Sequence, residues 1–79
     1  MEPFIGQIFV FPYEFVPRGF APCDGRLLPR TQHTALYALL GNRFGGSEEA
    51  FALPNYKGLA PPGSGYFIAL TGLFPNPDQ

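Results

Sequence analysis

A single cysteine and a single histidine are the residues of this sequence best suited to chemistry. Cys23 is followed directly by Asp24, and His33 lies ten residues further along the chain. A nucleophilic cysteine needs a lowered pKa, which a nearby cation or a helix N-terminus provides. The carboxylate of Asp24 has the opposite effect, and the first turn of the expected helix disfavours a charged His33. We therefore interpret Cys23 as a small buried residue beside a turn and predict no catalytic pair.

Two further stretches have a simple structural interpretation. The segment GNRFGGS at 41–47 resembles a phosphate-binding loop only in its glycines, because the Lys-Ser/Thr ending of that motif is absent. We interpret it as a helix end followed by a tight turn. Glu48 and Glu49 follow this turn, and we expect both carboxylates to be solvated. One cysteine and one histidine cannot form a four-ligand zinc site. We predict no enzymatic activity, no metal site and no cofactor.

The composition is that of a small domain that needs support. The 79 residues predict a single domain, 1–79, and a chain of this length buries only about 60–65% of its unfolded surface. Charged residues make up 14% of the chain, against about 25% in typical domains. The aromatic share of 16% argues against disorder. Neither a disulfide nor a zinc site is available, so partner subunits are the remaining means of stabilisation.

Charge and hydropathy exclude several classes of partner. The net charge is −1, and the five basic residues are scattered, whereas nucleic-acid binding requires a clustered basic face. The longest strongly apolar run, residues 67–70, is too short for a membrane span. The N-terminal stretch MEPFIGQ has no basic region typical of a secretory signal. We expect no nucleic-acid partner, no membrane span, and synthesis in the cytoplasm without a signal peptide.

Apolar runs and turn residues predict mostly short strands. Residues 4–11 and 66–74 are apolar on both faces, and we expect these two strands to lie near each other, with direct pairing as one arrangement. The Asp-Gly pair at 24–25 favours a type I′ turn that joins residues 19–23 and 26–29 in a hairpin. A short extended stretch is expected at 51–58, and residues 60–65 form a connector.

One helix is expected at about residues 32–40. Thr31 is the predicted N-cap, and Gly41 is the residue that ends the helix. Ala35, Leu36 and two further leucines form the apolar stripe, with those leucines at positions 39 and 40. The sequence thus predicts an α+β domain, small, loop-rich and mostly β, with short hairpins and one helix.

Aromatic side chains are the remaining functional candidates. In a domain with few charges, the core and the subunit interface are the common uses of such rings, and stacking on a sugar ring is the alternative. The candidate interface residues are Phe9, Phe11, Tyr13, Phe15, Tyr56, Tyr66, Phe67 and Phe74.

Five stretches taken in order resemble a known family. They are PFIGQI, PRGFAPCDGRLLP, TALYALLGNRFGG, FALPNYKG and FIALTGLFP, and they resemble the microcystin-dependent proteins of the phage tail collar family. Members usually have Trp at Phe20, Leu at Pro22 and Arg at Leu59, followed by a long Gly-rich insertion that APPGSG replaces here. The resemblance implies a collar-like fold and a role in assembly. It does not imply the metal-containing, receptor-binding tip of short tail fibres, because this chain has no matching residues.

Two functions follow as hypotheses. The first is a structural, self-assembling module of a phage-derived particle or related extracellular assembly, where the mature protein would reside. Its partner would be itself, as a homo-oligomer: the resemblance favours a trimer, and another ring or a filament remains open. Other tail or particle proteins are further candidate partners. The alternative is a small adhesin that binds a glycan or receptor.

Overall fold

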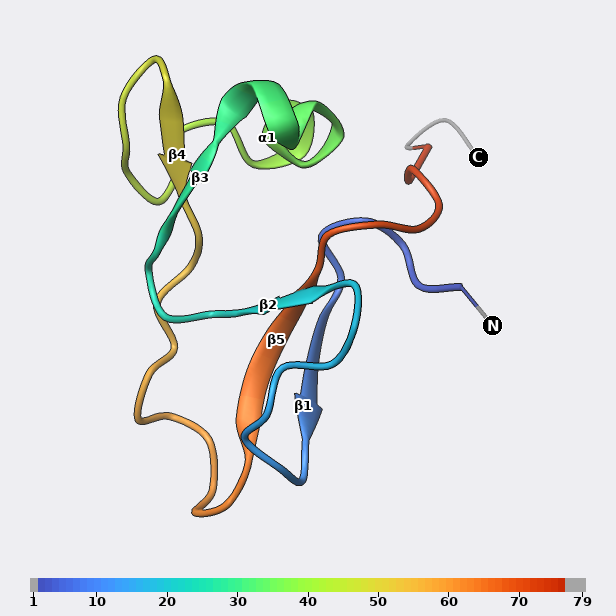
Figure 1. Ribbon diagram of the computed structural model, residues 1–79, viewed down its shortest axis with the longest axis vertical. Coiled ribbons are helices and arrows are strands. Elements are labelled where there is room, and N and C mark those ends of the chain that lie inside the picture. The colour runs from blue at the N-terminus through green and yellow to red at the C-terminus, as the bar shows by residue number, and fades with distance from the viewer. Residues whose placement is uncertain (1, 77–79) are drawn as a thin grey trace.

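The computed structural model describes residues 2–76, and Figure 1 shows two small sheets, one above the other in that view, with one helix beside the upper sheet. The lower sheet has three antiparallel strands in the order β1-β5-β2. Their bounds are Ile8–Phe11, Gly65–Ala69 and Phe20–Pro22 respectively. The strands and the helix give a small α+β domain, as predicted.

The first and last strands pair directly, which confirms that they are neighbours. Ile8 lies opposite Ile68, and Phe9 lies opposite Phe67. Both strands are shorter than predicted. Residues 4–7 form a turn, closed by the Gln7 N–H donating to the Phe4 carbonyl at 3.1 Å. The last strand ends at Ala69, and the chain bends at residues 70–72. Leu73 then forms a parallel bridge with Phe4.

The upper sheet contains β3 (Leu27–Pro29) and β4 (Ala50–Ala52), which pair antiparallel. The expected hairpin across Asp24 and Gly25 is therefore wrong, because β2 pairs with β5 and β3 pairs with β4. The type I′ turn is wrong as well, because it requires a positive φ at both central residues. Gly25 has a φ of 81°, but Asp24 does not have a positive φ, since only glycines do in the described part of the chain.

The physical reason is that the segment around Asp24 pairs with a distant stretch. The Gly25 N–H donates to the Pro54 carbonyl at 3.2 Å, and the Tyr56 N–H donates to the Cys23 carbonyl at 2.8 Å. Residues 23–26 thus run antiparallel to residues 53–56 and connect the two sheets. The chain satisfies its backbone groups non-locally, so the Asp-Gly pair makes a corner and not a hairpin.

The helical region has two parts. A 3₁₀ turn, η1, spans Arg30–Gln32, and the α-helix α1 spans Thr34–Leu40. The N-cap of α1 is His33 and not Thr31, because Pro29 leads straight into the 3₁₀ turn and places Thr31 inside it. The helix ends before Gly41, as predicted.

The core lies where the helix, β5 and residues 23–26, which we call the corner segment, meet. Ala21, Cys23 and four larger side chains form the buried cluster, the larger ones being Leu36, Phe51, Leu53 and Ile68. Leu36 of the predicted stripe is 1% exposed. This core is small, as the chain length implies.

Candidate functional site

A row of aromatic rings follows β1 and the loop after it. Phe9 and Phe11 lie on one face of β1 because alternate residues of a strand share a face. Tyr13 and Phe15 continue this spacing beyond the strand. Neighbouring ring centroids are 5.7, 5.3 and 4.2 Å apart in order along the chain, and the ring planes differ by only 18°, 13° and 8°. We call Phe9, Phe11, Tyr13 and Phe15 the aromatic row.

Two further rings support this row from neighbouring strands. The ring centroid of Phe20 in β2 lies 5.5 Å from the ring centroids of Phe9 and Phe11, and its ring is almost perpendicular to theirs. Phe67 of β5 lies 5.7 Å from Phe11 and is only 2% exposed. Phe67 therefore packs beneath the row. The edge-to-face contacts with Phe20 fix the orientation of the Phe9 and Phe11 rings on the sheet. Tyr13 and Phe15 continue the row by stacking alone.

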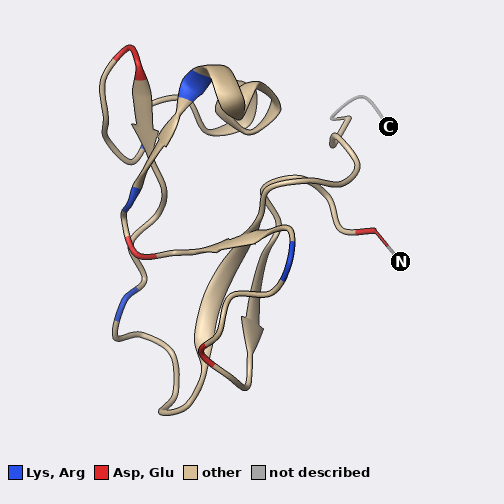
Figure 2. Cartoon of the chain, in the orientation of Figure 1, with Lys and Arg blue, Asp and Glu red and all other residues tan. Residues whose placement is uncertain are grey.

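Exposure increases along the aromatic row. Phe9, Phe11 and Tyr13 are half-buried, whereas Phe15 is 68% exposed. Figure 2 shows that β1 and β5 carry no charged residue. The face presented by the row is thus apolar, ordered and open at one end, which suits contact with another apolar surface.

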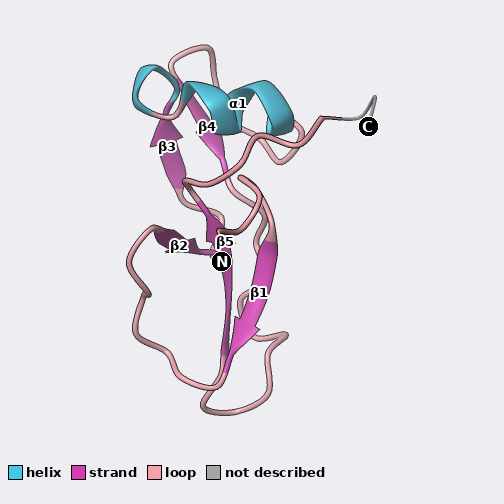
Figure 3. Cartoon of the chain, turned by 90° about the vertical axis from the view of Figure 1, so that its right-hand side faces the viewer, coloured by secondary structure: helices cyan, strands magenta, loops and turns pink. Residues whose placement is uncertain are grey.

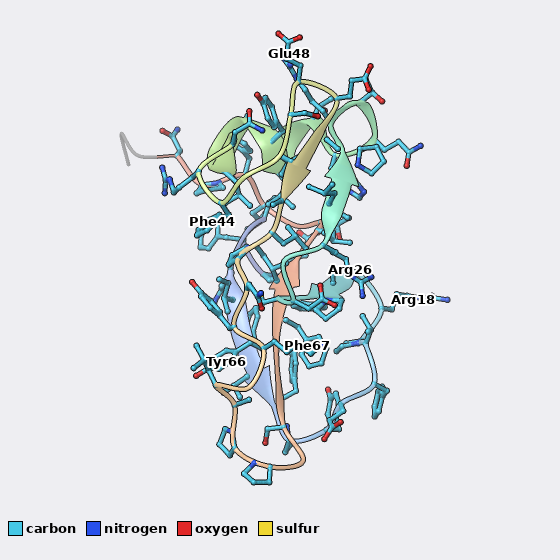
Figure 4. All side chains as sticks on the ribbon, turned by 90° about the vertical axis from the view of Figure 1, so that its left-hand side faces the viewer. Arg18, Arg26, Phe44, Glu48, Tyr66 and Phe67 are labelled. Carbon is cyan, nitrogen blue, oxygen red and sulfur yellow. The ribbon has the colours of Figure 1, made fainter. Side chains whose placement is uncertain are left out.

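Two other predicted interface residues form a separate group on the other side of β5. Tyr56 and Tyr66 meet edge to face, with ring centroids 5.6 Å apart. Figure 4 shows Tyr66 and Phe67 pointing to opposite sides of β5. The two tyrosines line a cleft of about 470 Å³, together with residues that include Glu14, Asp24, Lys57 and Pro61. We call this the tyrosine cleft.

The last predicted interface residue stands apart. Phe74 is 51% exposed and follows Leu73, which forms a parallel bridge with Phe4. It makes no ring contact with another aromatic residue in the described chain. Sequence reasoning also missed Phe20 as a member of this group, although it is an aromatic residue at the start of a short expected strand and stands where members of the resembled family usually have Trp.

Cys23 and His33 do not meet in a common site. Cys23 is 3% exposed and lies at the wall of the tyrosine cleft. Burial, with a smaller effect from Asp24, raises the pKa of the Cys23 thiol to about 11. His33 lines a different cavity, beside Leu36 and Thr71. The buried position of Cys23 agrees with its interpretation as a packing residue.

An ion pair joins Asp24 and Arg26 in the corner segment. The Arg26 guanidinium donates to both carboxylate oxygens of Asp24, at 3.1 and 3.0 Å. This hydrogen bonding lowers the pKa of Asp24 despite its partial burial.

In the described part of the chain, no group of three or more acidic, cysteine or histidine residues could hold a metal ion. No helix among those residues is long and apolar enough to cross a membrane.

Comparison with protein families gives one match. Residues 6–61 match the model of the Phage Tail Collar Domain, which confirms the resemblance to that family. The matched segment runs from the turn before β1 to the wall of the tyrosine cleft and includes the aromatic row and Phe20, but not Phe67. A search of curated proteins gives no match.

Proposed function

Because the chain belongs to the phage tail collar family, we propose that it is a structural module that associates with copies of itself in a phage-derived particle. The family is a structural one of phage tails. The same membership supports a place in the virion, and we propose the virion or a related extracellular assembly as the site of the mature protein. The closer assignment to the microcystin-dependent proteins remains a prediction from sequence.

The observation that carries this proposal is the aromatic row. An ordered, uncharged face on a domain with a small core is better covered than left in water. Burying about 800 Å² per subunit, half of it apolar, contributes on the order of 10 kcal/mol before the costs of association. That gain is comparable to the whole stability of a small domain. Association would therefore stabilise both the face and the fold.

Sedimentation of the purified chain at micromolar concentration tests the proposal. We expect a fixed multiple of the 8.7 kDa chain mass, or a large polymer. Negative-stain images of the same sample distinguish a closed oligomer from a filament. A single folded species near 8.7 kDa would contradict the proposal.

The tyrosine cleft supports a second candidate function, that of a glycan-binding module. Its two tyrosines offer ring surface, and the carboxylates of Glu14 and Asp24 at its wall can accept hydrogen bonds from sugar hydroxyls. The chain contains no Trp, so its ultraviolet emission reports tyrosines directly. A glycan array followed by fluorescence titration tests this function. Binding that Tyr56→Ala abolishes and Phe15→Ala leaves intact would support it, and a blank array would reject it.

A further inference from the structure

The strand β1 occupies an outer edge of the three-stranded sheet, where half of its backbone groups face away from β5. The Ala69 N–H donates to the Gln7 carbonyl at 3.0 Å, so odd-numbered residues of β5 bond toward β1. Paired residues of an antiparallel ladder bond on alternate positions. Phe9 and Phe11 therefore bond to β5, through their register with Phe67 and Gly65.

It follows that the N–H and C=O groups of Ile8 and Val10 point outward. Among the described residues, no hydrogen bond outside the strand ladder reaches either residue. Figure 3 shows β1 as the outermost strand of its sheet, with β5 on one side of it and no other strand on the other side. The edge of β1 thus presents two donors and two acceptors at regular spacing.

The other edges are closed or shorter. On β2, the Phe20 N–H donates to the Pro17 carbonyl at 3.1 Å, and Pro22 has no N–H. On β4, the Ala52 N–H donates to the Gly45 carbonyl at 3.1 Å, which covers that edge with the loop before it. On β3, one outward residue, Leu27, is followed at the next outward position by Pro29.

The edge of β1 also lacks the features that usually prevent strand addition. Residues 3–13 contain no charged side chain, whereas exposed edges are commonly protected by lysine, a bulge or a covering loop. Val10 is 53% exposed. Pro12 follows the strand and occupies the next outward position after Val10. Because proline has no N–H, the open edge ends there, but the outward groups of Ile8 and Val10 stay accessible.

We propose that β1 pairs antiparallel with β1 of a second copy of this chain, about a twofold axis through Phe9. In this register Ile8 lies opposite Val10 of the partner subunit, and each pair exchanges two hydrogen bonds. All the outward groups of the two strands are then satisfied. The pairing joins the two three-stranded sheets into one six-stranded sheet. Its strand order is β2-β5-β1 from one copy, followed by β1-β5-β2 from the second copy. This inference rests on the proposed self-association and specifies its surface.

The ends of this register explain why a second copy fits better than an unrelated strand. The paired stretch ends on one side at Pro12, which has no N–H, and on the other side at the turn that contains Gly6. The Gly6 N–H already donates to the Ala69 carbonyl at 2.9 Å, so neither end leaves a donor unpaired. The twofold axis also keeps both Phe9 rings on one face, where they lie directly opposite each other. The two aromatic rows thus meet across the new contact, and such cross-strand aromatic pairs are favourable.

Disulfide trapping tests the register directly. Phe9→Cys places two cysteines opposite each other in a non-hydrogen-bonded pair, where Cα atoms lie about 4.5 Å apart, within the range a disulfide spans. With oxidised glutathione we expect a covalent dimer. Phe15→Cys is the matched control, because Phe15 is more exposed but lies beyond the strand. The buried Cys23 contributes little background. Trapping of Phe9→Cys no faster than Phe15→Cys would overturn the inference.

A backbone variant tests the hydrogen bonds. Val10→Pro removes an outward donor and no bond to β5, and Val10→Thr is its matched control with the N–H retained. We expect Val10→Pro to weaken association by about tenfold or more, since each symmetric contact loses two bonds, and Val10→Thr to leave it within about twofold. Circular dichroism shows whether Val10→Pro folds, and if it does not, the disulfide experiment decides. Unchanged association of a folded Val10→Pro would overturn the inference.

The assembly state separates this inference from the proposed function. Twofold pairing of β1 requires an even number of subunits, so a dimer or an even multiple supports it. A trimer would overturn the inference and leave self-association standing. A wild-type chain that sediments as a folded monomer would overturn both.

Discussion

Cys23 shows how environment decides whether a lone cysteine is reactive. Its backbone N–H donates to the Tyr66 carbonyl at 3.0 Å, and its own carbonyl accepts from the Tyr56 N–H. The side chain is thereby held between β5 and the corner segment, where it is 3% exposed. The acidic neighbour, visible in the sequence, indicated the direction of the pKa shift, but burial is the larger cause, and burial depends on pairing that no local pattern reveals.

The raised pKa of Cys23 predicts a specific pH dependence of stability. Burial raises the pKa of the Cys23 thiol from 9.0 to about 11, so the folded chain holds its proton more tightly than the unfolded chain. The stabilisation is fully present below pH 9 and is lost as the pH rises toward about 11. Over that window wild-type should lose about 2–3 kcal/mol more than Cys23→Ala, as measured by urea unfolding. Tyrosine and lysine titrate in both chains and cancel.

A second measurement on the same residue is thiol alkylation. At pH 8 the folded chain should react with iodoacetamide at least about tenfold more slowly than the urea-unfolded chain, because little thiolate is present. Equal rates, or identical stability profiles for wild-type and Cys23→Ala, would show that the thiol is accessible and that its pKa is not raised.

At the scale of elements, local patterns predicted which segments are extended or helical better than they predicted pairing. The helix end at Gly41 was correct, since the position of a glycine is a local signal. The first and last strands were correctly expected to be neighbours, because both are apolar on both faces, but their register was not predicted. The partner of β2 lies more than forty residues away in β5. The Asp-Gly pair at 24–25 favours a tight turn of the chain, and such a turn fits a hairpin and a corner between two sheets equally well. Only the long-range bonds distinguish these two structures.

A pair of glycine substitutions tests the turn between α1 and β4. Gly46 and Gly58 both have positive φ, 110° and 84°, so alanine at either is strained by about 1–2 kcal/mol. A Cβ at Gly46 would also collide with the Ala50 carbonyl oxygen and lie 2.7 Å from the Phe51 Cα, whereas at Gly58 it would meet nothing within 4 Å.

Gly46→Ala should therefore lower the free energy of unfolding by more than about 3 kcal/mol, and Gly58→Ala by only about 1–2 kcal/mol. The difference measures the close approach at the Gly46–Phe51 bridge, because the obstructing atoms belong to the backbone and cannot rotate away. Chemical denaturation of both variants provides the comparison. Equal losses would mean that the turn relaxes around the added methyl group.

At the scale of the whole molecule, the family match and the fold divide the chain differently. The matched residues, 6–61, contain the two outer strands of the three-stranded sheet, whereas the central strand β5 lies beyond them. β5 also supplies Phe67, which supports the aromatic row from below. The sequence allowed the row's members to be named as interface candidates. Their alignment into one face could not be predicted, because it depends on β5 and on the missed Phe20.

The aromatic row can be divided by mutation into a part that holds the fold and a part available to a partner. Phe11 lies at its centre, against Phe20 and Phe67 as well as its neighbours in the row. Phe11→Ala should therefore cost about 3 kcal/mol of stability. Phe15 is 68% exposed and stacks only at its inner side, on Tyr13. Phe15→Ala should change stability by less than about 1 kcal/mol and yet weaken self-association.

The two measurements are urea unfolding and sedimentation over a concentration series. The expected result is a separation of effects: Phe11→Ala is destabilised, whereas Phe15→Ala is as stable as wild-type and dissociates at concentrations at least about fivefold higher, since even 1 kcal/mol of lost contact changes an equilibrium by that factor. Leu59→Ala is the control, because Leu59 is equally exposed, at 68%, and lies outside the row. If Phe15→Ala and Leu59→Ala associate alike, the exposed end of the row does not contact a partner, and the contact between copies does not extend beyond β1 to Phe15.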